Sequence, residues 1–173
     1  HEIHAKIKMP VFQSGDRPYQ DFGGDVLFQQ GMPQVQDYEE VCLAITVPKT
    51  ESPEEGWPSV IYAHGTNGSF RSGSKLIGYG ASVYEHEDSM ASMVTFSIDQ
   101  VMHGDRIGED RSLSPGPLFF NIQNPAAARG NLIQGALDQF ALVRFIKDSN
   151  ILDNWEIEGL GVLPIDRRRI SYH

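Results

Sequence analysis

Several features that would assign a chain to a broad class at once are scarce or missing from this sequence. It has one cysteine, Cys42, so no disulfide can close within the chain. No run approaches the roughly 18 apolar residues that a membrane-spanning helix needs. Basic residues are few, and 14 lysines and arginines against 23 acidic residues give a net charge of -9. Because such a surface repels phosphate backbones, we expect no nucleic-acid partner, and the lack of a long apolar run predicts no membrane span.

What remains is an ordinary globular composition. The 173 residues, 40% hydrophobic and 21% charged, have the size of one domain and show no internal repeat. The basic cluster at residues 167–169 is interpreted as a solvated flank before a strand rather than a phosphate site. The chain begins at His1 instead of Met, which fits removal of a secretion signal. We therefore expect a secreted or periplasmic protein, with the cytoplasm as the alternative.

The first fifty residues predict short antiparallel strands. Residues 4–12, 24–31 and 40–48 alternate apolar and polar side chains and are separated by Gly, Pro and Gln. In the last of these runs Cys42 occupies a strand position, where a small apolar cysteine is usually a packing residue. A polar, proline-containing turn at residues 49–58 closes this region.

From residue 56 onward, apolar runs alternate with helical segments. The runs are residues 60–63, Val94–Ile98 and 170–173. Helical spacing predicts one helix over residues 72–87, and a second over Pro125–Asp148 with Asn124 as its cap. Residues 100–123 are rich in Gly and Pro and are predicted to be loop. In the second helix the expected buried face consists of Ile133, Leu137, Phe140 and Val143.

This order of elements predicts an α/β fold. Strand, helix, strand, helix, strand implies a mostly parallel sheet with right-handed crossovers and helices on both faces, preceded here by the antiparallel strands. Ligands of such sheets bind beyond the carboxyl ends of the strands. The places of interest therefore follow Ala63, Asp99 and His173.

The segment HGTNG, residues 64–68, follows the first of these strand ends. Glycines and small residues allow the backbone to curl so that several N–H groups point into one cavity. Acyl-transfer enzymes need such a cavity, because preorganised N–H donors stabilise the negative charge on the former carbonyl oxygen. A glycine turn that only leads the chain out of a strand is the alternative, and these five residues alone do not decide between the two.

Four segments, taken in order, resemble the α/β-hydrolase superfamily, in particular its bacterial lipase- and esterase-like members. The matching segments are GWPSVIYAHGTNGSF (56–70), VTFSIDQVMHGDR (94–106), NPAAARGNLIQGALDQFALVRFI (124–146) and IDRRRISYH (165–173). The resemblance implies that the three apolar runs are the third, fourth and fifth strands of that fold. It also implies that the backbone N–H of Thr66, or alternatively of Asn67, stabilises an oxyanion, within a loop that includes His64, Gly65 and Gly68.

In this family the nucleophilic serine occupies a G-x-S-x-G turn directly after the fifth strand. No G-x-S-x-G occurs among the 173 residues. We therefore expect no catalytic residue in this chain: the nucleophile, acid and base would follow His173 in a longer parent. The chain, residues 1–173, would be the N-terminal part of a single α/β-hydrolase domain whose fold it leaves incomplete.

Other chemically active residues near the strand ends have plainer interpretations. The resemblance makes His64 a residue that orients the loop rather than a catalytic base. Asp99, His103 and Asp105 do not have the spacing of a known metal motif, so no metal is expected, and His103 is interpreted as a substrate contact at the pocket rim. Phe119 and Phe120 would line an acyl pocket or pack in the core.

The sequence thus predicts a serine carboxylic-ester hydrolase that works through an acyl-enzyme without a cofactor. Its expected partners are a small-molecule ester or lipid substrate and the remaining C-terminal segment of the same protein. The alternative is a non-catalytic binding or accessory domain that keeps the fold, because a fold does not determine a function.

Overall fold

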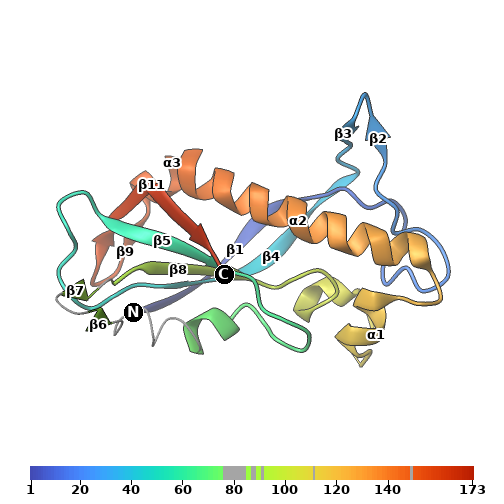
Figure 1. Cartoon of the computed structure of the whole chain (residues 1–173), viewed down its shortest axis with the longest axis horizontal. Helices are drawn as coiled ribbons and strands as arrows, with labels where there is room; N and C mark the ends of the chain where they lie inside the picture. The colour runs from blue at the N-terminus through green and yellow to red at the C-terminus, as the bar shows by residue number, and fades with distance from the viewer. Residues whose placement is uncertain (76–84, 87–88, 91, 111, 149) are drawn as a thin grey trace.

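The structure is a computed structural model that describes residues 1–75, 85–86, 89–90, 92–110, 112–148 and 150–173. Its centre is a five-stranded sheet of order β1-β4-β8-β5-β11, with the strands at Glu2–Val11 (β1), Asp37–Thr46 (β4), Val94–Ile98 (β8), Trp57–Tyr62 (β5) and Ile165–Tyr172 (β11) (Figure 1). β8, β5 and β11 are parallel, and β4 joins them antiparallel through β8. β1 pairs with β4 over ten residues, also antiparallel.

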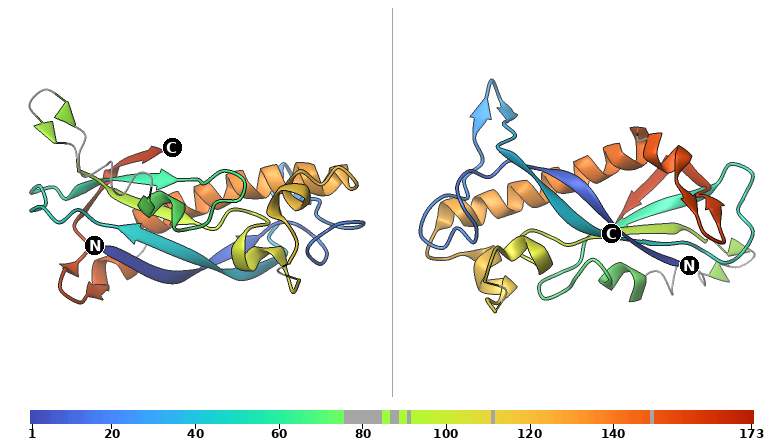
Figure 2. Two further views of the ribbon diagram at one scale, coloured as in Figure 1. Left: turned by 90° about the horizontal axis from the view of Figure 1, so that it is seen from below. Right: turned by 180° about the vertical axis from the view of Figure 1, so that it is seen from behind.

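The remaining elements are short except for one helix. They are β2 (Phe28–Gln29), β3 (Met32–Pro33), β6 (Glu85–His86), β7 (Ser89–Met90), η2 (Gly104–Ile107), α1 (Pro115–Phe120), α2 (Pro125–Asp148), α3 (Asn150–Asn154), β9 (Glu156–Ile157) and β10 (Gly161–Val162). The β2–β3 hairpin and the β6–β7 pair both project from the body of the molecule, at opposite ends (Figure 2). α2 lies across the sheet and contacts β1, β5 and β11 (Figure 1).

The predicted fold class is confirmed: a mixed sheet has parallel strands at its centre and antiparallel strands before them. β5 lies between the two other parallel strands, so its crossovers leave in opposite directions. The β8 strand is buried along its whole length, as expected for a central parallel strand covered on both faces. The core of the sheet contains Val41, Leu43, Ile45, Ile61, Phe96, Ile98, Leu142 and Ile146.

The predicted burial of α2 is wrong in its direction. Phe140 is 68% exposed, and Leu137 and Val143 are only half-buried. The buried stripe lies about one position further along the helix, at Ala127, Asn131, Gln134, Asp138, Leu142 and Ile146. Three of these six side chains are polar, and counting apolar residues alone therefore selected the wrong face.

The first predicted helix, over residues 72–87, lies largely outside the described residues. Its last part is wrong, because Glu85–His86 forms β6 and pairs antiparallel with Ser89–Met90. The predicted loop at residues 100–123 contains α1, whose first residue is Pro115. Proline is compatible with a first helical turn, because its missing N–H would have no intrahelical partner there.

β11 begins five residues earlier than predicted and contains a bulge between Ile165 and Ile170. Within the bulge, Asp166 accepts hydrogen bonds from Arg168 and Arg169, at 2.9 Å and 2.8 Å from their Nε atoms. Both arginines are exposed, as expected for a solvated cluster, but the cluster lies within β11 and not before a strand as predicted. These bonds lower the pKa of Asp166 well below its ordinary value.

Candidate functional site

A cavity of about 440 Å³ lies at the carboxyl ends of the parallel strands. Its wall includes residues that follow β5 and β8, the last residue of β11 and the middle of α2. The lining residues are Ala63, His64, Gly65, Thr66, Gln100, His103, Phe119, Asn131, Leu132, Gly135, Ala136, Gln139 and Tyr172. The fold thus brings the segment HGTNG and His103 to one cavity. Of the predicted aromatic pair, Phe119 lines it, whereas Phe120 is 59% exposed.

A larger groove of about 890 Å³ lies elsewhere, between β1 and the C-terminal half of α2. It is lined mainly by apolar side chains, among them Ile7, Phe145 and Trp155. We place the candidate site at the smaller cavity, because there the strand ends, two buried histidines and a glycine turn meet.

The segment HGTNG forms a tight turn. The Gly68 N–H donates to the Gly65 carbonyl oxygen at 3.0 Å, and Asn67, between them, has φ of 65°. Asparagine tolerates this left-handed conformation better than most residues. Gly68 is required for a different reason: a Cβ there would lie 2.7 Å from Nδ1 of His64. The turn is therefore packed directly against the His64 imidazole.

The partners of His64 decide which ring nitrogen carries the proton. Its Nδ1 lies 2.9 Å from the Gly65 carbonyl oxygen, which can only accept, so the hydrogen is assigned to Nδ1. Its Nε2 accepts a hydrogen bond of 3.0 Å from the Gln100 N–H. Burial lowers the pKa of His64, helped by nearby His103 and Arg106 and opposed by the Gly65 carbonyl, in agreement with a neutral ring. His64 thereby joins the turn to the end of β8.

His103 repeats this arrangement from the other side. Its Nδ1 lies 2.9 Å from the Val101 carbonyl oxygen, and its Nε2 accepts a hydrogen bond of 3.2 Å from the Asn67 N–H. The His103 side chain is buried, and its ring meets the His64 ring edge to face with centroids 4.8 Å apart. His103 lines the cavity, but its Nε2 is occupied by the hydrogen bond from the Asn67 N–H.

The two predicted oxyanion donors therefore differ in whether their backbone N–H already has a hydrogen-bond acceptor. The Asn67 N–H is donated to His103. Thr66 is exposed at the cavity, and no acceptor for its N–H is found in the described part of the chain. Thr66 is thus the one of the two whose N–H is available to a ligand.

Asp99 anchors the far end of the same loop. Its Oδ1 accepts a hydrogen bond of 2.8 Å from the Phe70 N–H. Its Oδ2 packs against Gly104, where a Cβ would lie 2.3 Å from that oxygen. Burial raises the pKa of Asp99, partly opposed by the Phe70 hydrogen bond and by Arg106. The carboxylate therefore acts on the backbone of the loop, while no metal-ligand group of three or more His, Cys, Asp or Glu occurs among the described residues.

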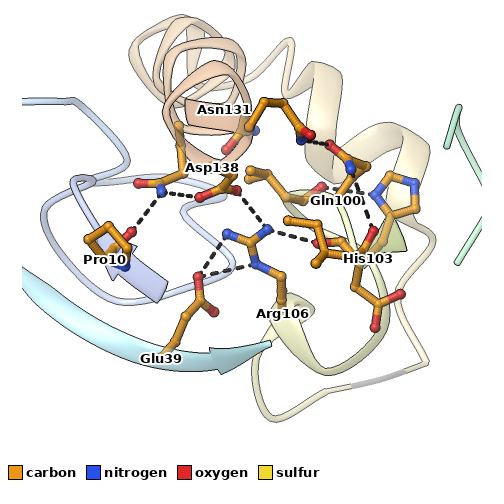
Figure 3. Close-up of polar contacts among 12 residues, drawn as sticks. Pro10, Glu39, Gln100, His103, Arg106, Asn131 and Asp138 are labelled. Atoms are coloured by element: carbon orange, nitrogen blue, oxygen red, sulfur yellow. Dashed lines mark hydrogen bonds and ion pairs between the residues drawn. The ribbon is translucent and has the colours of Figure 1, made fainter. Parts of the chain in front are cut away.

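Arg106 lies beneath the site with its charge fully buried. Its Nη1 lies 2.7 Å from Asp138 Oδ2 and also donates to the Asp99 carbonyl oxygen at 2.9 Å (Figure 3). Its Nε and Nη2 donate to Glu39 Oε1 at 3.1 Å and 2.8 Å. Burial acts to lower the pKa of Arg106, but Asp138 and Glu39 outweigh it and raise the pKa. This pairing connects β4 and α2 with the end of β8, where the site begins.

The polar side chains of α2 extend the same network to the N-terminal region. Gln134 accepts a hydrogen bond from the Phe12 N–H at 2.7 Å and donates to the Pro10 carbonyl oxygen at 3.0 Å. Asn131 accepts from Gln13 Nε2 at 2.9 Å and donates to two carbonyl oxygens of α1. The side-chain amides of Asn131 and Gln134 thus find their partners in other parts of the chain, as burial requires.

The sequence interpretation missed this network: Glu39, Arg106, Asn131, Gln134 and Asp138. A usable signal was present, because the three polar residues of α2 continue the same three- and four-residue steps as Leu142 and Ile146. The partners could not be read in the same way, since Arg106 and Glu39 lie far from α2 in the sequence.

The cavity lining includes Thr66, whose main-chain N–H has no acceptor among the described residues, whereas both imidazoles are already occupied by the backbone. In the described part of the chain, neither is hydrogen-bonded to a serine, threonine or cysteine side chain, so no nucleophile–base pair lines the cavity. As for the membrane, none of the described helices is long and apolar enough to cross one.

Comparison with known proteins finds no matching family model and no matching curated protein. Among solved structures, the chain is similar to the peroxisomal α/β-hydrolase Lpx1 from Saccharomyces cerevisiae, with 16% sequence identity and a TM-score of 0.40. The similarity covers 86% of this chain and 34% of that chain, so the present chain spans about a third of its length. At this level of similarity, no residue role or activity is transferred from that protein.

Proposed function

We propose that this chain supplies the oxyanion-binding part of a serine carboxylic-ester hydrolase. The carrying observation is Thr66: its N–H has no acceptor among the described residues, and it lines the cavity at the carboxyl ends of the parallel strands. A preorganised N–H at such a position lowers the energy of the tetrahedral intermediate of acyl transfer. The ester carbonyl oxygen would sit against Thr66, and the acyl group would lie along α2 between Leu132 and Ala136.

The attacking serine would come from polypeptide outside these residues, because the described lining of the cavity holds no nucleophile–base pair. β11 offers a place for it. Tyr172, the last residue of this strand, lines the cavity, and the strand's edge away from β5 is unpaired among the described strands. A further strand or turn that packs there would enter the cavity beside Thr66. In this proposal the C-terminal segment of a longer protein is the first partner, and a small-molecule ester or lipid is the substrate.

A second function, a non-catalytic binding or accessory domain, has an observation in its favour as well. His64 and His103 each accept a backbone hydrogen bond at Nε2, so neither ring is free to act as a general base. A cavity with a fixed donor and no base would bind a carbonyl compound without reacting with it.

The experiment that separates these functions uses the natural full-length protein. We would measure hydrolysis of a chromogenic short-chain ester and labelling by a serine-directed phosphonate. Stable labelling together with ester turnover supports the hydrolase; absence of both supports the binding domain.

Thr66→Pro then tests the site, because proline removes the N–H, and loss of one oxyanion donor lowers kcat by about 10²–10³-fold. Thr66→Ala is the matched control: it removes the hydroxyl, keeps the N–H and should retain most of the activity. Equal activity of the two variants would exclude Thr66 as the donor.

A further inference from the structure

We propose that His64 and His103 form a proton-sensitive clamp on the 64–68 turn: while both imidazoles are neutral they hold the turn, and their protonation releases it. Both are positioning residues that act through the backbone. The clamp follows from their hydrogen bonds and does not depend on ester hydrolysis. If the proposed function is also correct, the clamp is what places the Thr66 N–H.

The clamp is made of two hydrogen bonds of the same unusual kind. In each, a main-chain N–H donates to an imidazole Nε2: Asn67 to His103 at 3.2 Å, and Gln100 to His64 at 3.0 Å. A protonated Nε2 is itself a donor, so it would face another donor across the same distance. The opposite ring nitrogens cannot relieve this conflict, because each Nδ1 already faces a carbonyl oxygen.

The two bonds tie the turn to a rigid part of the molecule. Gln100 lies two residues after the buried strand β8, and His103 directly precedes η2, which Arg106 holds against Asp138 and Glu39. Asn67, by contrast, lies on an exposed turn with φ of 65°. Loss of the clamp would therefore move the turn, and leave the sheet in place.

The charges around His64 also disfavour protonation of its ring. The rings lie 4.8 Å apart, so a second proton would bring two cations together in a buried place. Arg106, beneath them, adds a positive charge that Asp138 of α2 and Glu39 of β4 balance. Asp99 directs Oδ1 to the Phe70 N–H, and Asp105 is exposed on η2.

The direction of the pH dependence follows from His64. Because burial lowers its pKa in the folded protein, the unfolded chain binds more protons as the pH falls below the ordinary histidine value of about 6.5. The clamp's contribution is thus fully present above that pH and is lost progressively below it. The turn should be held at neutral pH and released in mild acid.

Two measurements on the intact chain test the clamp without any substrate. The first is the ¹⁵N chemical shift of the ring nitrogens at neutral pH. We expect Nδ1 to be protonated and Nε2 unprotonated in both His64 and His103, and a protonated Nε2 in either residue would overturn the proposal. This measurement needs no variant.

The second is amide hydrogen exchange, corrected at each pH for the rate in an unstructured peptide. Between about pH 7.5 and pH 5, the protection of the Asn67 and Gln100 N–H groups should fall about tenfold, the effect of losing one hydrogen bond. Protection at Ile61 and Phe96 in the sheet should stay constant. Constant protection at Asn67, or an equal fall in the sheet, would contradict a local clamp.

His103→Gln separates the two halves of the clamp, because the glutamine Oε1 can accept the Asn67 hydrogen bond and does not titrate. In this variant, protection at Asn67 should change less than about twofold over the same pH range, whereas Gln100 should still respond through His64. His1→Gln, which removes a histidine far from the turn in the sequence, is the control and should behave as the wild type. An unchanged response of Asn67 in His103→Gln would exclude His103 as the sensor.

Discussion

In its C-terminal half, α2 packs Leu142 and Ile146 onto the apolar core of the sheet, and both side chains are 0% exposed. Closer to its N-terminus, the positions that continue the same stripe are Asn131, Gln134 and Asp138, which are equally buried. The buried stripe of α2 therefore has two parts. We call Leu142 and Ile146, with the core they contact, the apolar layer, and Asn131, Gln134 and Asp138, with their partners, the polar layer.

The difference matters because the two layers specify structure in different ways. Apolar contacts are nondirectional, so the first layer contributes stability and accepts many shapes of similar volume. Each buried polar group instead needs a partner at a set distance and angle. The polar layer therefore places particular groups, including the Asp99 carbonyl oxygen that Arg106 holds at the end of β8. The candidate site lies at the end of α2 that carries this polar layer.

The largest effect should come from breaking the polar layer. Asp138→Ala leaves the buried Arg106 charge without the carboxylate 2.7 Å away, and we expect a loss of about 3–5 kcal/mol in the free energy of unfolding. Chemical denaturation measures it. Asp148→Ala, an exposed acidic residue at the end of the same helix, is the control and should change the value by less than about 0.5 kcal/mol.

A double variant sharpens this test. Arg106→Met with Asp138→Leu replaces the pair by apolar side chains, while Arg17 continues to pair with Glu39. Its loss in the free energy of unfolding should be smaller than that of Asp138→Ala, because no unpaired charge remains from the Arg106–Asp138 pair.

If Asp138→Ala alone lowered the free energy of unfolding by less than about 1 kcal/mol, the polar layer would not be the constraint described here.

A smaller effect is expected in the apolar layer. Leu142→Ala removes a fully buried side chain and should lower the free energy of unfolding by about 3 kcal/mol. Phe140→Ala lies two positions away on the same helix but is 68% exposed, so its loss should stay below about 1 kcal/mol. Thermal and chemical unfolding of the two variants give the comparison. The reverse ranking would mean that α2 presents its other face to the sheet.

The smallest effect concerns two glycines at the N-terminal half of α2. A Cβ at Gly130 would lie 1.7 Å from the Gly24 carbonyl oxygen, so Gly130→Ala should cost about 1–3 kcal/mol. A Cβ at Gly135 would lie 3.9 Å from Val101, an ordinary contact, and Gly135→Ala should stabilise the helix by about 0.5–1 kcal/mol. Opposite signs in the two melting temperatures support the close approach of α2 to Gly24, and equal signs contradict it.

Much of the architecture could be predicted because it depends on local patterns. The β8 run is apolar throughout because its strand is covered on both faces, and Asn124 and Pro125 indicate the start of α2. The position of HGTNG beyond a strand end could also be predicted, since small residues directly follow an apolar strand. α1 was missed because proline and glycine, read as loop residues, are also compatible with a first helical turn.

The amino-acid sequence by itself determined the approximate positions of α2 and of the five strands of the main sheet along the chain, and that a glycine turn follows β5, because periodicity and turn chemistry act between near neighbours. Only the tertiary structure decided which face of α2 is buried and which amide of the turn remains unpaired. The face depends on Arg106, which reaches Asp138 across 32 positions, and the amide depends on His103, 36 positions after Asn67. Burial of a polar group is stable only where a hydrogen-bonding or ion-pair partner lies beside it. Here those partners come from distant parts of the chain, so a local sequence pattern cannot identify them.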